Sequence, residues 1–216
     1  MLIYYANLLN KRGGVFVEFV LVRHVETTGN YENKFVGFTE VEYTERGKKQ
    51  FVQLTDALKE LKVDQIYSSP ISRALKIAKK VGEDTLTDVK VIDELSEMNF
   101  GIFEGLHFTD ILNDHAEHWE EWQKDYLNFT IPSGESLQSF HHRVTTFIDT
   151  IKNEEGSCMI VCHGGTVQSI LTHLLDLQME QRWHFHIPLA GIVKITYTED
   201  YGMLHSLTTA ATDGAP

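Results

Sequence analysis

Short apolar runs alternate along this chain with longer segments in which apolar residues return every three or four positions. Residues 15–22 form a β-branched and aromatic run with one charge, Glu18, which is typical of a buried strand in a parallel sheet. Similar runs predict further strands at residues 63–68, 89–92, 157–162, 192–197 and 203–207. Helical spacing predicts helices at residues 44–61, from 69 onward, 136–151 and 166–175. This alternation predicts an α/β fold: a three-layer α/β/α sandwich with a mostly parallel sheet.

Two of the predicted helices have recognisable first residues. Thr44 can cap the helix over residues 44–61 with its hydroxyl group. Ser69-Pro70 is expected to open the next helix, because a serine can cap it and proline is tolerated in a first turn. The segment over about residues 106–131 is polar and rich in aromatic residues, and we expect it to form a helical lid insertion.

The composition limits the number of domains and the kinds of partner. The 216 residues, 42% of them hydrophobic, contain no linker-like or repetitive tract, so we expect a single domain over residues 1–216. The formal net charge of −12 argues against a nucleic-acid partner and an anionic membrane, and no apolar run approaches the ~20 residues of a membrane span. Cys158 and Cys162 do not resemble a disulfide framework and fit a cytoplasmic location.

The first 16 residues have two interpretations. Residues 1–10 are apolar, but the basic pair Lys11-Arg12 follows them, which is a poor signal-peptide pattern. Residues 11–14 (KRGG) can be encoded by a purine run that resembles a bacterial ribosome-binding site, and Val17 could be a GTG start codon. Residues 1–16 are therefore either a mis-called start or a genuine extra strand or arm. The nucleotide sequence of the gene distinguishes the two.

Cationic and imidazole side chains follow the predicted strands at the edge where ligands bind in open α/β sheets. Arg23 and His24 end the first apolar run, and His163 follows a later strand. Arg73 lies in the first turn of the helix expected after residue 69. Because a guanidinium group offers a planar fork of donors, these arginines suit the oxygens of a phosphoryl group.

Two further features favour a site for an anion. Gly164-Gly165 leads from His163 into a helix, and glycines let backbone N–H groups approach an anion closely. Asn30 could donate another amide. Taken singly, each arginine is more often part of a surface ion pair, and His163 is more often an ordinary histidine at a strand end. The ordered combination reverses that expectation.

Four motifs, taken in order, resemble the histidine phosphatase superfamily, also called the phosphoglycerate-mutase-like superfamily. The first is Arg23-His24, and the others are residues 67–74 (YSSPISRA), 97–105 (EMNFGIFEG) and 161–165 (VCHGG). The resemblance runs from about residue 17 to about residue 196. It implies the α/β fold of that family and a phosphomonoesterase that works through a phosphohistidine intermediate.

The resemblance also implies roles for individual residues. His24 maps to the nucleophile of the family, and His163 then supports the transferring phosphoryl oxygens. Glu97 maps to the carboxyl group that protonates the leaving oxygen and later activates water, with Glu26 and Glu104 as rival carboxylates. Neither a metal nor a cofactor is implied, because arginines and histidines supply the charge.

The chain departs from the family pattern at three positions. Val25 follows the nucleophile where the family usually has glycine, and Gly29 stands where it usually has tryptophan. Gln168 occupies a position where the family often has arginine. None of these changes removes a catalytic group, but they leave the shape of the loop and the pose of the substrate open.

The predicted lid bears on the substrate. It contains one lysine, Lys124, and no arginine, whereas a phosphoglycerate mutase needs cations there for a carboxylate and a second phosphate. Trp119 and Trp122 could instead stack on an aromatic leaving group. They could equally be the core of the lid helices.

A closer resemblance is to the α-ribazole phosphatases of cobalamin nucleotide-loop assembly. It rests on the tryptophan-rich lid and on residues 94–101 (ELSEMNFG), 131–136 (IPSGES), Arg143 and 183–185 (WHF). It implies a small phosphate ester, α-ribazole 5′-phosphate, as the substrate. The alternatives are a broad-specificity sugar or nucleotide phosphatase, a phosphoglycerate mutase, and an inactive binding module. Oligomeric state does not follow from the sequence, so a homodimer stays open.

Overall fold

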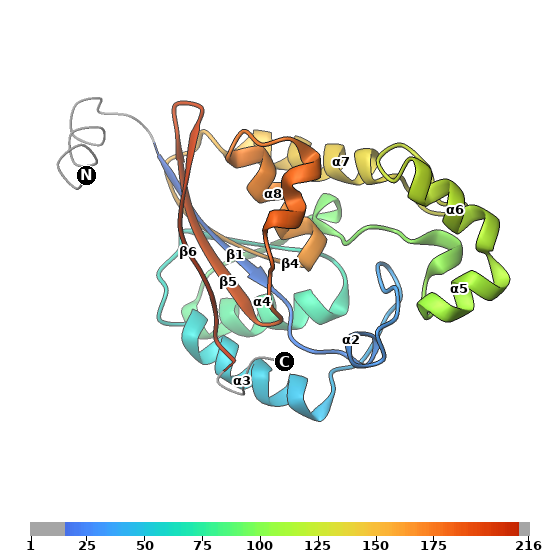
Figure 1. Cartoon of the computed structure of the whole chain (residues 1–216). Coiled ribbons are helices and arrows are strands. Elements are labelled where there is room, and N and C mark those ends of the chain that lie inside the picture. The colour runs from blue at the N-terminus through green and yellow to red at the C-terminus, as the bar shows by residue number, and fades with distance from the viewer. Residues whose placement is uncertain (1–15, 212–216) are drawn as a thin grey trace.

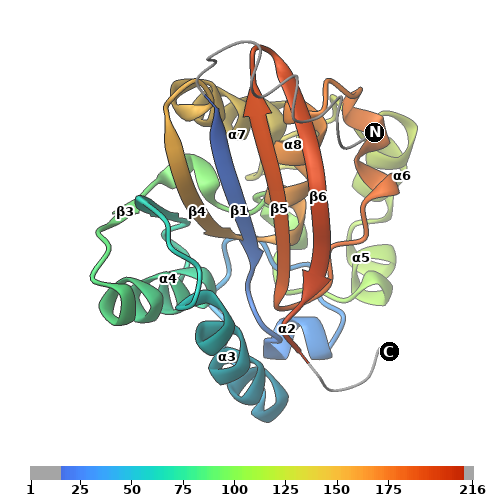
Figure 2. The same cartoon turned by 90° about the vertical axis from the view of Figure 1, so that its left-hand side faces the viewer.

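The computed structural model describes residues 16–211, and its strands form one six-stranded sheet in the order β3-β2-β4-β1-β5-β6 (Figures 1 and 2). β1, β2, β3 and β4 pair in parallel, whereas β5 is antiparallel to both β1 and β6. The prediction of a mostly parallel sheet is therefore confirmed. The strands are β1 Val17–Arg23, β2 Gln65–Ser68, β3 Val89–Val91, β4 Gly156–Cys162, β5 Gly191–Thr198 and β6 Tyr201–Thr209.

Helices cover both faces of the sheet, which confirms the α/β/α sandwich (Figure 1). α7 and α8 pack on one face, and α3 and α4 pack on the other. α5 and α6 project beyond the end of the sheet and form the predicted helical lid. The α-helices are α2 Thr28–Tyr31, α3 Glu45–Leu58, α4 Ser72–Thr85, α5 Phe108–Asp114, α6 Ala116–Lys124, α7 Leu137–Ile151 and α8 Gly164–Leu174. The 3₁₀ helices are η1 Asp93–Leu95, η2 Gly101–Phe103 and η3 Met179–His184.

The first apolar run is continuous because β1 is buried on both faces. Phe19 and Leu21 join a core cluster with α7 and α8, and Val20 and Val22 join a second cluster with α3 and α4. Successive side chains of a strand point to opposite faces, so a central strand of a sandwich needs apolar residues at every position. Packing on both faces therefore holds β1 in one position along its axis. This position fixes the point at which Arg23 leaves the sheet.

Helix boundaries differ from the predictions in small but informative ways. Thr44 does cap α3, since its hydroxyl accepts a hydrogen bond from the Gly47 amide at 2.9 Å. α4 begins at Ser72, so the expectation that Ser69-Pro70 opens it is wrong. The Ser69 hydroxyl instead accepts from the Ile71 amide, at 3.2 Å, in the turn before the helix. The two interpretations of the N-terminal segment concern residues that, apart from Phe16, lie outside the described part of the chain.

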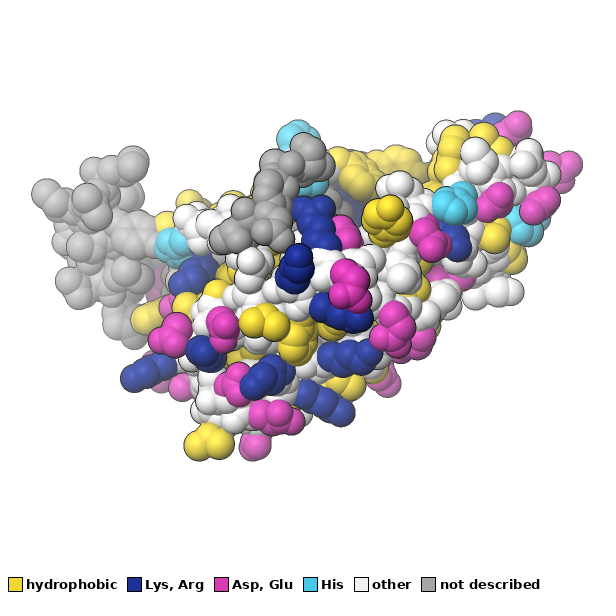
Figure 3. All heavy atoms as spheres, turned by 90° about the horizontal axis from the view of Figure 1, so that it is seen from below, with side chains coloured by type: hydrophobic (Ala, Val, Ile, Leu, Met, Phe, Trp, Pro, Cys, Tyr) yellow, Lys and Arg dark blue, Asp and Glu magenta, His cyan; other side chains and the backbone are white. Residues whose placement is uncertain are grey.

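The face seen in Figure 3 mixes positive and negative side chains. On α3, ion pairs join Lys48 to Glu45 at 2.6 Å and Lys59 to Asp56 at 2.7 Å. This face therefore offers no continuous basic field for a polyanion. Over residues 16–211, no helix combines the length and apolar character that a membrane span requires.

Candidate active site

The four motifs meet at the carboxyl end of β1 and β4. Arg23 pairs with Cys162 in the parallel register of the two strands, so the next residues, His24 and His163, leave the sheet side by side. The His24 amide donates to the Cys162 carbonyl at 3.1 Å, and the two imidazole centroids lie 5.2 Å apart. Arg73 reaches the same place from the first turn of α4. The structure thus brings the predicted cations and histidines together.

The His24 side chain is 4% exposed, and its environment keeps the imidazole neutral. Its Nδ1 lies 2.7 Å from the Val25 carbonyl oxygen, which can only accept, so Nδ1 carries the proton and Nε2 carries a lone pair. Burial lowers the pKa of His24 well below its usual value, and the nearby charges of Arg73 and Arg23 lower it further. Val25 takes part through its carbonyl group, and its side chain packs in the core cluster with α3 and α4.

Arg73 is held by backbone carbonyl groups of the 36–39 loop. Its Nη2 donates to the carbonyls of Val36 at 3.3 Å and Gly37 at 2.6 Å, and its Nη1 donates to that of Thr39 at 3.2 Å. Its Nε donates to the Nε2 of His24 at 3.3 Å. Burial lowers the pKa of Arg73, against the opposing effect of Glu97 and other carboxylates. The guanidinium group is therefore fixed beside the lone pair of His24.

Glu104 shapes the loop that holds Arg73. Its carboxylate accepts hydrogen bonds from the backbone amides of Gly37, Phe38 and Thr39, at 2.9–3.1 Å. It also accepts from the Thr39 hydroxyl at 2.7 Å. Because both carboxylate oxygens already accept hydrogen bonds from the loop, the structure supports a structural role for Glu104.

The His163 ring is fully buried beside Ser69. Its Nε2 lies 2.7 Å from the hydroxyl of Ser69. That hydroxyl already accepts from the Ile71 amide, so its own proton is best directed at Nε2, which assigns the proton of neutral His163 to Nδ1. Nδ1 is buried and has no hydrogen-bond partner among residues 16–211. Burial lowers the pKa of His163 well below its usual value, followed by the effect of Arg73. His163 thus offers an N–H donor for a ligand.

Arg23 and the first turn of α8 lie against each other. Arg23 donates through Nη1 to the Ile187 carbonyl, and its buried Nε makes no hydrogen bond within the described part of the chain. A Cβ atom at Gly164 would lie 3.2 Å from the Arg23 guanidinium carbon. The glycine therefore lets the N-terminus of α8 and the arginine close on the same point. Burial lowers the pKa of Arg23, and Glu97 opposes this.

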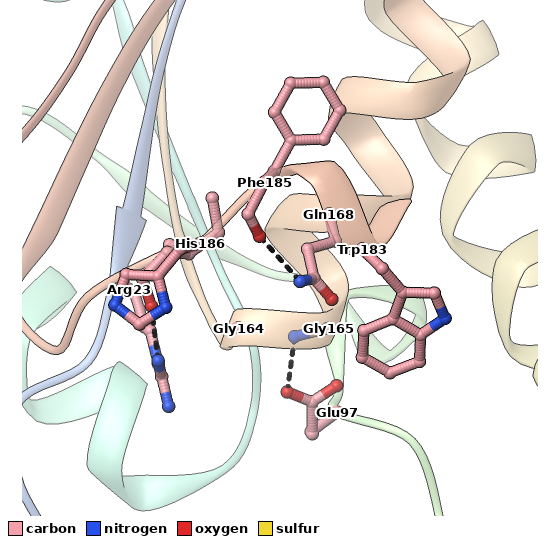
Figure 4. Close-up of a pocket in the computed structure, with 9 residues that line it drawn as sticks. Arg23, Glu97, Gly164, Gly165, Gln168, Trp183, Phe185 and His186 are labelled. Atoms are coloured by element: carbon pink, nitrogen blue, oxygen red, sulfur yellow. Dashed lines mark hydrogen bonds between the residues drawn. The ribbon is translucent and has the colours of Figure 1, made fainter. Parts of the chain in front are cut away.

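Glu97 lies close enough to Arg23 and Arg73 to act on the pKa values of both guanidinium groups. Its Oε2 accepts from the Gly165 amide at 2.9 Å, and its Oε1 accepts from the Met98 amide at 3.0 Å. Arg143 braces the backbone around it by donating to the carbonyls of Glu94, Ser96 and Glu97 at 2.8–2.9 Å. Figure 4 shows the carboxylate below the first turn of α8, with Arg23 on one side and Trp183 on the other.

A cavity of about 370 Å³ lies beside Arg23, Glu97 and the first turn of α8, whereas His24, Arg73 and His163 are not among the residues that line it. Its size lies within the range of small-molecule sites. The residues that line it include Arg23, Glu97, Gly164, Gly165, Gln168 and Trp183 (Figure 4). It is therefore a cavity with a cation at one end and an aromatic ring at the other.

The other predicted site residues lie elsewhere. Asn30 accepts through Oδ1 from the Thr27 amide and hydroxyl, at 3.1 and 2.9 Å, at the start of α2. Trp119 and Trp122 are partly buried in an aromatic cluster with Phe35, Phe100 and Phe103. Neither tryptophan is among the residues that line the cavity. A role for these three residues in binding substrate stays a prediction for experiment.

The rival carboxylate Glu26 is bound away from the histidines. It accepts from the Thr44 hydroxyl at 2.6 Å and pairs with Arg46 at 3.5 Å. This fits the reading of Glu26 as a loop residue. Within residues 16–211, no group of three or more histidine, cysteine or acidic side chains is arranged to hold a metal ion.

Sequence reasoning did not assign a role to Arg182, although it is 3% exposed and lies at the site. Its Nη2 donates to the Gly165 carbonyl at 3.0 Å and to Gln168 Oε1 at 3.2 Å. Burial lowers its pKa to about 10, against the effect of Glu97. Gln168 could have pointed to Arg182. Because Gln168 stands where the family often has arginine, another cation is expected nearby. With Arg23 and Arg73 it supplies the local positive charge that an anionic substrate needs in an acidic protein.

The chain is similar to known phosphatases over most of its length. The model of the histidine phosphatase superfamily (branch 1) matches residues 19–209. A Hydrogenobacter thermophilus protein provisionally named phosphoserine phosphatase 2 is 34% identical over 176 residues, which cover 81% of this chain and 87% of that protein. The adenosylcobalamin/α-ribazole phosphatase of Salmonella typhimurium is 30% identical over 193 residues, which cover 88% of this chain and 96% of that protein.

The fold is shared with a solved relative. The crystal structure of the α-ribazole phosphatase from Shigella flexneri aligns with a TM-score of 0.82 at 28% identity, over 92% of this chain and all of that chain (100%). The family motifs, the matching fold and the histidine-rich site agree. This chain belongs to the histidine phosphatase superfamily, branch 1, and is a phosphatase.

Proposed function

We propose that this phosphatase transfers the phosphoryl group of a phosphate monoester to His24 and then hydrolyses the phosphohistidine. The observation that carries the proposal is the neutral, buried His24, whose Nε2 lone pair faces the site beside Arg73 and His163. In the first step Nε2 bonds to phosphorus and the bond from phosphorus to the ester oxygen breaks. In the second step a water oxygen bonds to phosphorus and the P–N bond breaks, which returns neutral His24.

The phosphoryl oxygens would take the donors that the structure leaves beside His24. Arg73 Nε–H points at the His24 lone pair, so an arriving phosphoryl group would draw this donor to its own oxygens and free the nucleophile. His163 Nδ1 and Arg23 Nε are buried without protein partners within residues 16–211, and either could donate to the same oxygens. The first amides of α8, beginning at Gly164, add the positive end of a helix.

We assign the proton transfers to Glu97. As a carboxylic acid it would give its proton to the leaving alkoxide, and as the resulting carboxylate it would take a proton from the attacking water. Its position across the cavity from Arg23 suits both steps (Figure 4). The hydrogen bonds from Gly165 and Met98 hold the carboxyl group in one orientation.

The substrate we propose is α-ribazole 5′-phosphate. Relatives named for this activity align over 88% of the chain, and the motifs at residues 94–101 and 183–185 support the same choice. The 34% identity to a protein named for phosphoserine makes phosphoserine the second candidate. The lid over α5 and α6 carries one lysine, Lys124, on its exposed face, which does not favour a phosphoglycerate mutase.

The experiment is a comparison of kcat/KM for α-ribazole 5′-phosphate, phosphoserine, 3-phosphoglycerate and p-nitrophenyl phosphate, with and without a chelator. We expect turnover that resists the chelator and is fastest on α-ribazole 5′-phosphate. Faster turnover of phosphoserine would favour the second candidate, and equal rates on all esters would favour a broad-specificity phosphatase. Absence of turnover on every ester would mean an inactive binding module.

We place this activity in the cytoplasm. Cys158 and Cys162 are both free and buried, and burial raises the pKa of Cys158 to about 12, which leaves it an unreactive thiol. Fractionation of cells that express the tagged protein tests this. A homodimer stays a prediction that sedimentation of the purified protein can test.

A further inference from the structure

We propose that Trp183 is the platform on which the substrate's leaving alcohol stacks a planar aromatic group, so that this residue sets the preference for base-bearing phosphate esters. The inference rests on the proposed function, because it takes the phosphoryl group to lie at His24 and the proton donor to be Glu97. It places the aromatic contact on η3, whereas the sequence left open a contact with the lid tryptophans or a core role for them.

The positions of His24 and Glu97 set the direction in which the leaving group extends. The phosphoryl group must lie between His24 and the donors around it, and the ester oxygen must face Glu97. In Figure 4 Arg23 lies on one side of Glu97, and the indole of Trp183 lies on the other. The alcohol that carries the ester oxygen therefore extends from Glu97 towards Trp183. Gln168 and Phe185 line the same part of the cavity.

Trp183 differs from the lid tryptophans in its exposure to solvent. Trp183 is 66% exposed although it lines a cavity, whereas Trp119 and Trp122 are partly buried against each other, with ring centroids 5.1 Å apart. Single exposed apolar side chains are common on protein surfaces, but Trp183 also lines the cavity that holds Glu97, where a bound ligand would cover its ring. The lid tryptophans already have aromatic partners, so they offer less surface to a substrate.

Arg182 supports the Trp183 ring. The guanidinium carbon of Arg182 lies 5.4 Å from the centroid of the Trp183 ring. Hydrogen bonds to the Gly165 carbonyl and Gln168 fix that guanidinium, so the indole rests against a cation that cannot move away. A cation on one face draws the electron density of the indole towards it. The exposed side of the ring then favours an electron-rich planar partner, such as the base of a nucleoside-like phosphate.

The chemistry that this arrangement recognises is a ribose phosphate with an uncharged aromatic base. The base would gain stacking on Trp183, as single-stranded bases do on aromatic platforms. A phosphate ester of a small amino acid or of a sugar alone would leave the indole uncovered. The platform thus selects for the presence of a base.

The test compares two ribose phosphates, one with an aromatic base at C1′ and one with a hydroxyl group in its place. We measure kcat/KM for α-ribazole 5′-phosphate and for ribose 5-phosphate in the wild type and in Trp183→Leu, Trp183→Phe and Tyr201→Leu. Tyr201 is the matched control, because it is 61% exposed on β6 and does not line the cavity. We expect Trp183→Leu to lower the preference for the base-bearing ester by about 10- to 100-fold, the scale of base–aromatic stacking. Trp183→Phe should restore most of it, and Tyr201→Leu should leave it unchanged.

Two results would overturn the inference. One is an equal loss on both substrates in Trp183→Leu. The other is an unchanged preference in Trp183→Leu with a selective loss in Trp122→Leu, which would return the platform to the lid. Adenosine 5′-monophosphate separates this inference from the substrate assignment. If adenosine 5′-monophosphate depends on Trp183 but α-ribazole 5′-phosphate is a poor substrate, the platform stands and the proposed substrate fails.

Discussion

The two ends of the active site are built in different ways. At the phosphoryl end, His24, His163 and Arg73 are buried, and each is bound to backbone or to a neighbouring side chain. At the leaving-group end, Trp183 is exposed and comes from a 3₁₀ turn outside the sheet. The difference indicates where precision is needed. Phosphoryl transfer needs fixed donors at the ends of rigid strands, whereas substrate choice can rest on a surface that is easily changed.

His24→Ala is the largest break of the phosphoryl end. Removal of the nucleophile should cost several orders of magnitude in kcat, because the variant loses the Nε2 lone pair that would bond to phosphorus. The measurement is the hydrolysis of p-nitrophenyl phosphate. His142→Ala, a change of an exposed histidine on α7, is the control and should keep full activity. A His24→Ala enzyme with more than about a tenth of the wild-type rate would remove His24 as the nucleophile.

Glu104→Ala tests whether the phosphoryl end depends on its loop. The change leaves the amides of Gly37, Phe38 and Thr39 without their acceptor, so the loop should shift and Arg73 should lose carbonyl partners. We expect a loss of about 1–3 kcal/mol in the free energy of unfolding and a fall of about tenfold or more in kcat/KM on every ester. Glu45→Ala, on the exposed surface of α3, is the control for loss of a carboxylate. Wild-type rates in Glu104→Ala would show that Arg73 does not need the loop.

The buried histidines also predict a smaller effect, on stability in acid. The folded-state pKa values of His24 and His163 lie well below the usual value, so above about pH 6.5 both histidines are neutral whether the chain is folded or unfolded. As the pH falls below about 6.5, only the unfolded chain takes up the protons, and stability is lost. Each histidine should contribute up to about 1.4 kcal/mol per pH unit. Between about pH 7 and pH 5, the free energy of unfolding measured with urea should therefore fall less steeply in His24→Ala than in the wild type. Equal slopes would contradict a neutral, buried His24.

The phosphoryl end could be predicted from the sequence for a physical reason. Arg23 and His163 directly follow apolar runs, and parallel strands carry such residues to one edge of the sheet. The error at Ser69 was local, since a serine before proline can cap a helix or, as here, turn the chain and hold a histidine. Arg182 and Trp183 lie in a short 3₁₀ segment without periodic apolar residues. Residues 183–185 form part of the closer resemblance, but their contact with the cavity arises from packing of the segment on α8, which the sequence does not specify.

The proposed mechanism transfers the phosphoryl group to His24 and uses Glu97 first as acid and then as base. The Glu97→Gln variant separates these two roles. p-Nitrophenyl phosphate leaves as a stable anion and needs little acid, so the variant should release a burst of nitrophenol and then turn over slowly. An alkyl phosphate should show no burst, because its leaving oxygen needs the missing proton.

The decisive measurement is the site of the phosphoryl group in Glu97→Gln protein quenched after the burst and mapped by mass spectrometry. We expect an acid-labile, base-stable phosphoryl group on His24. A phosphoryl group on another residue, or equal slowing of both esters with no burst and no phosphoprotein, would contradict it.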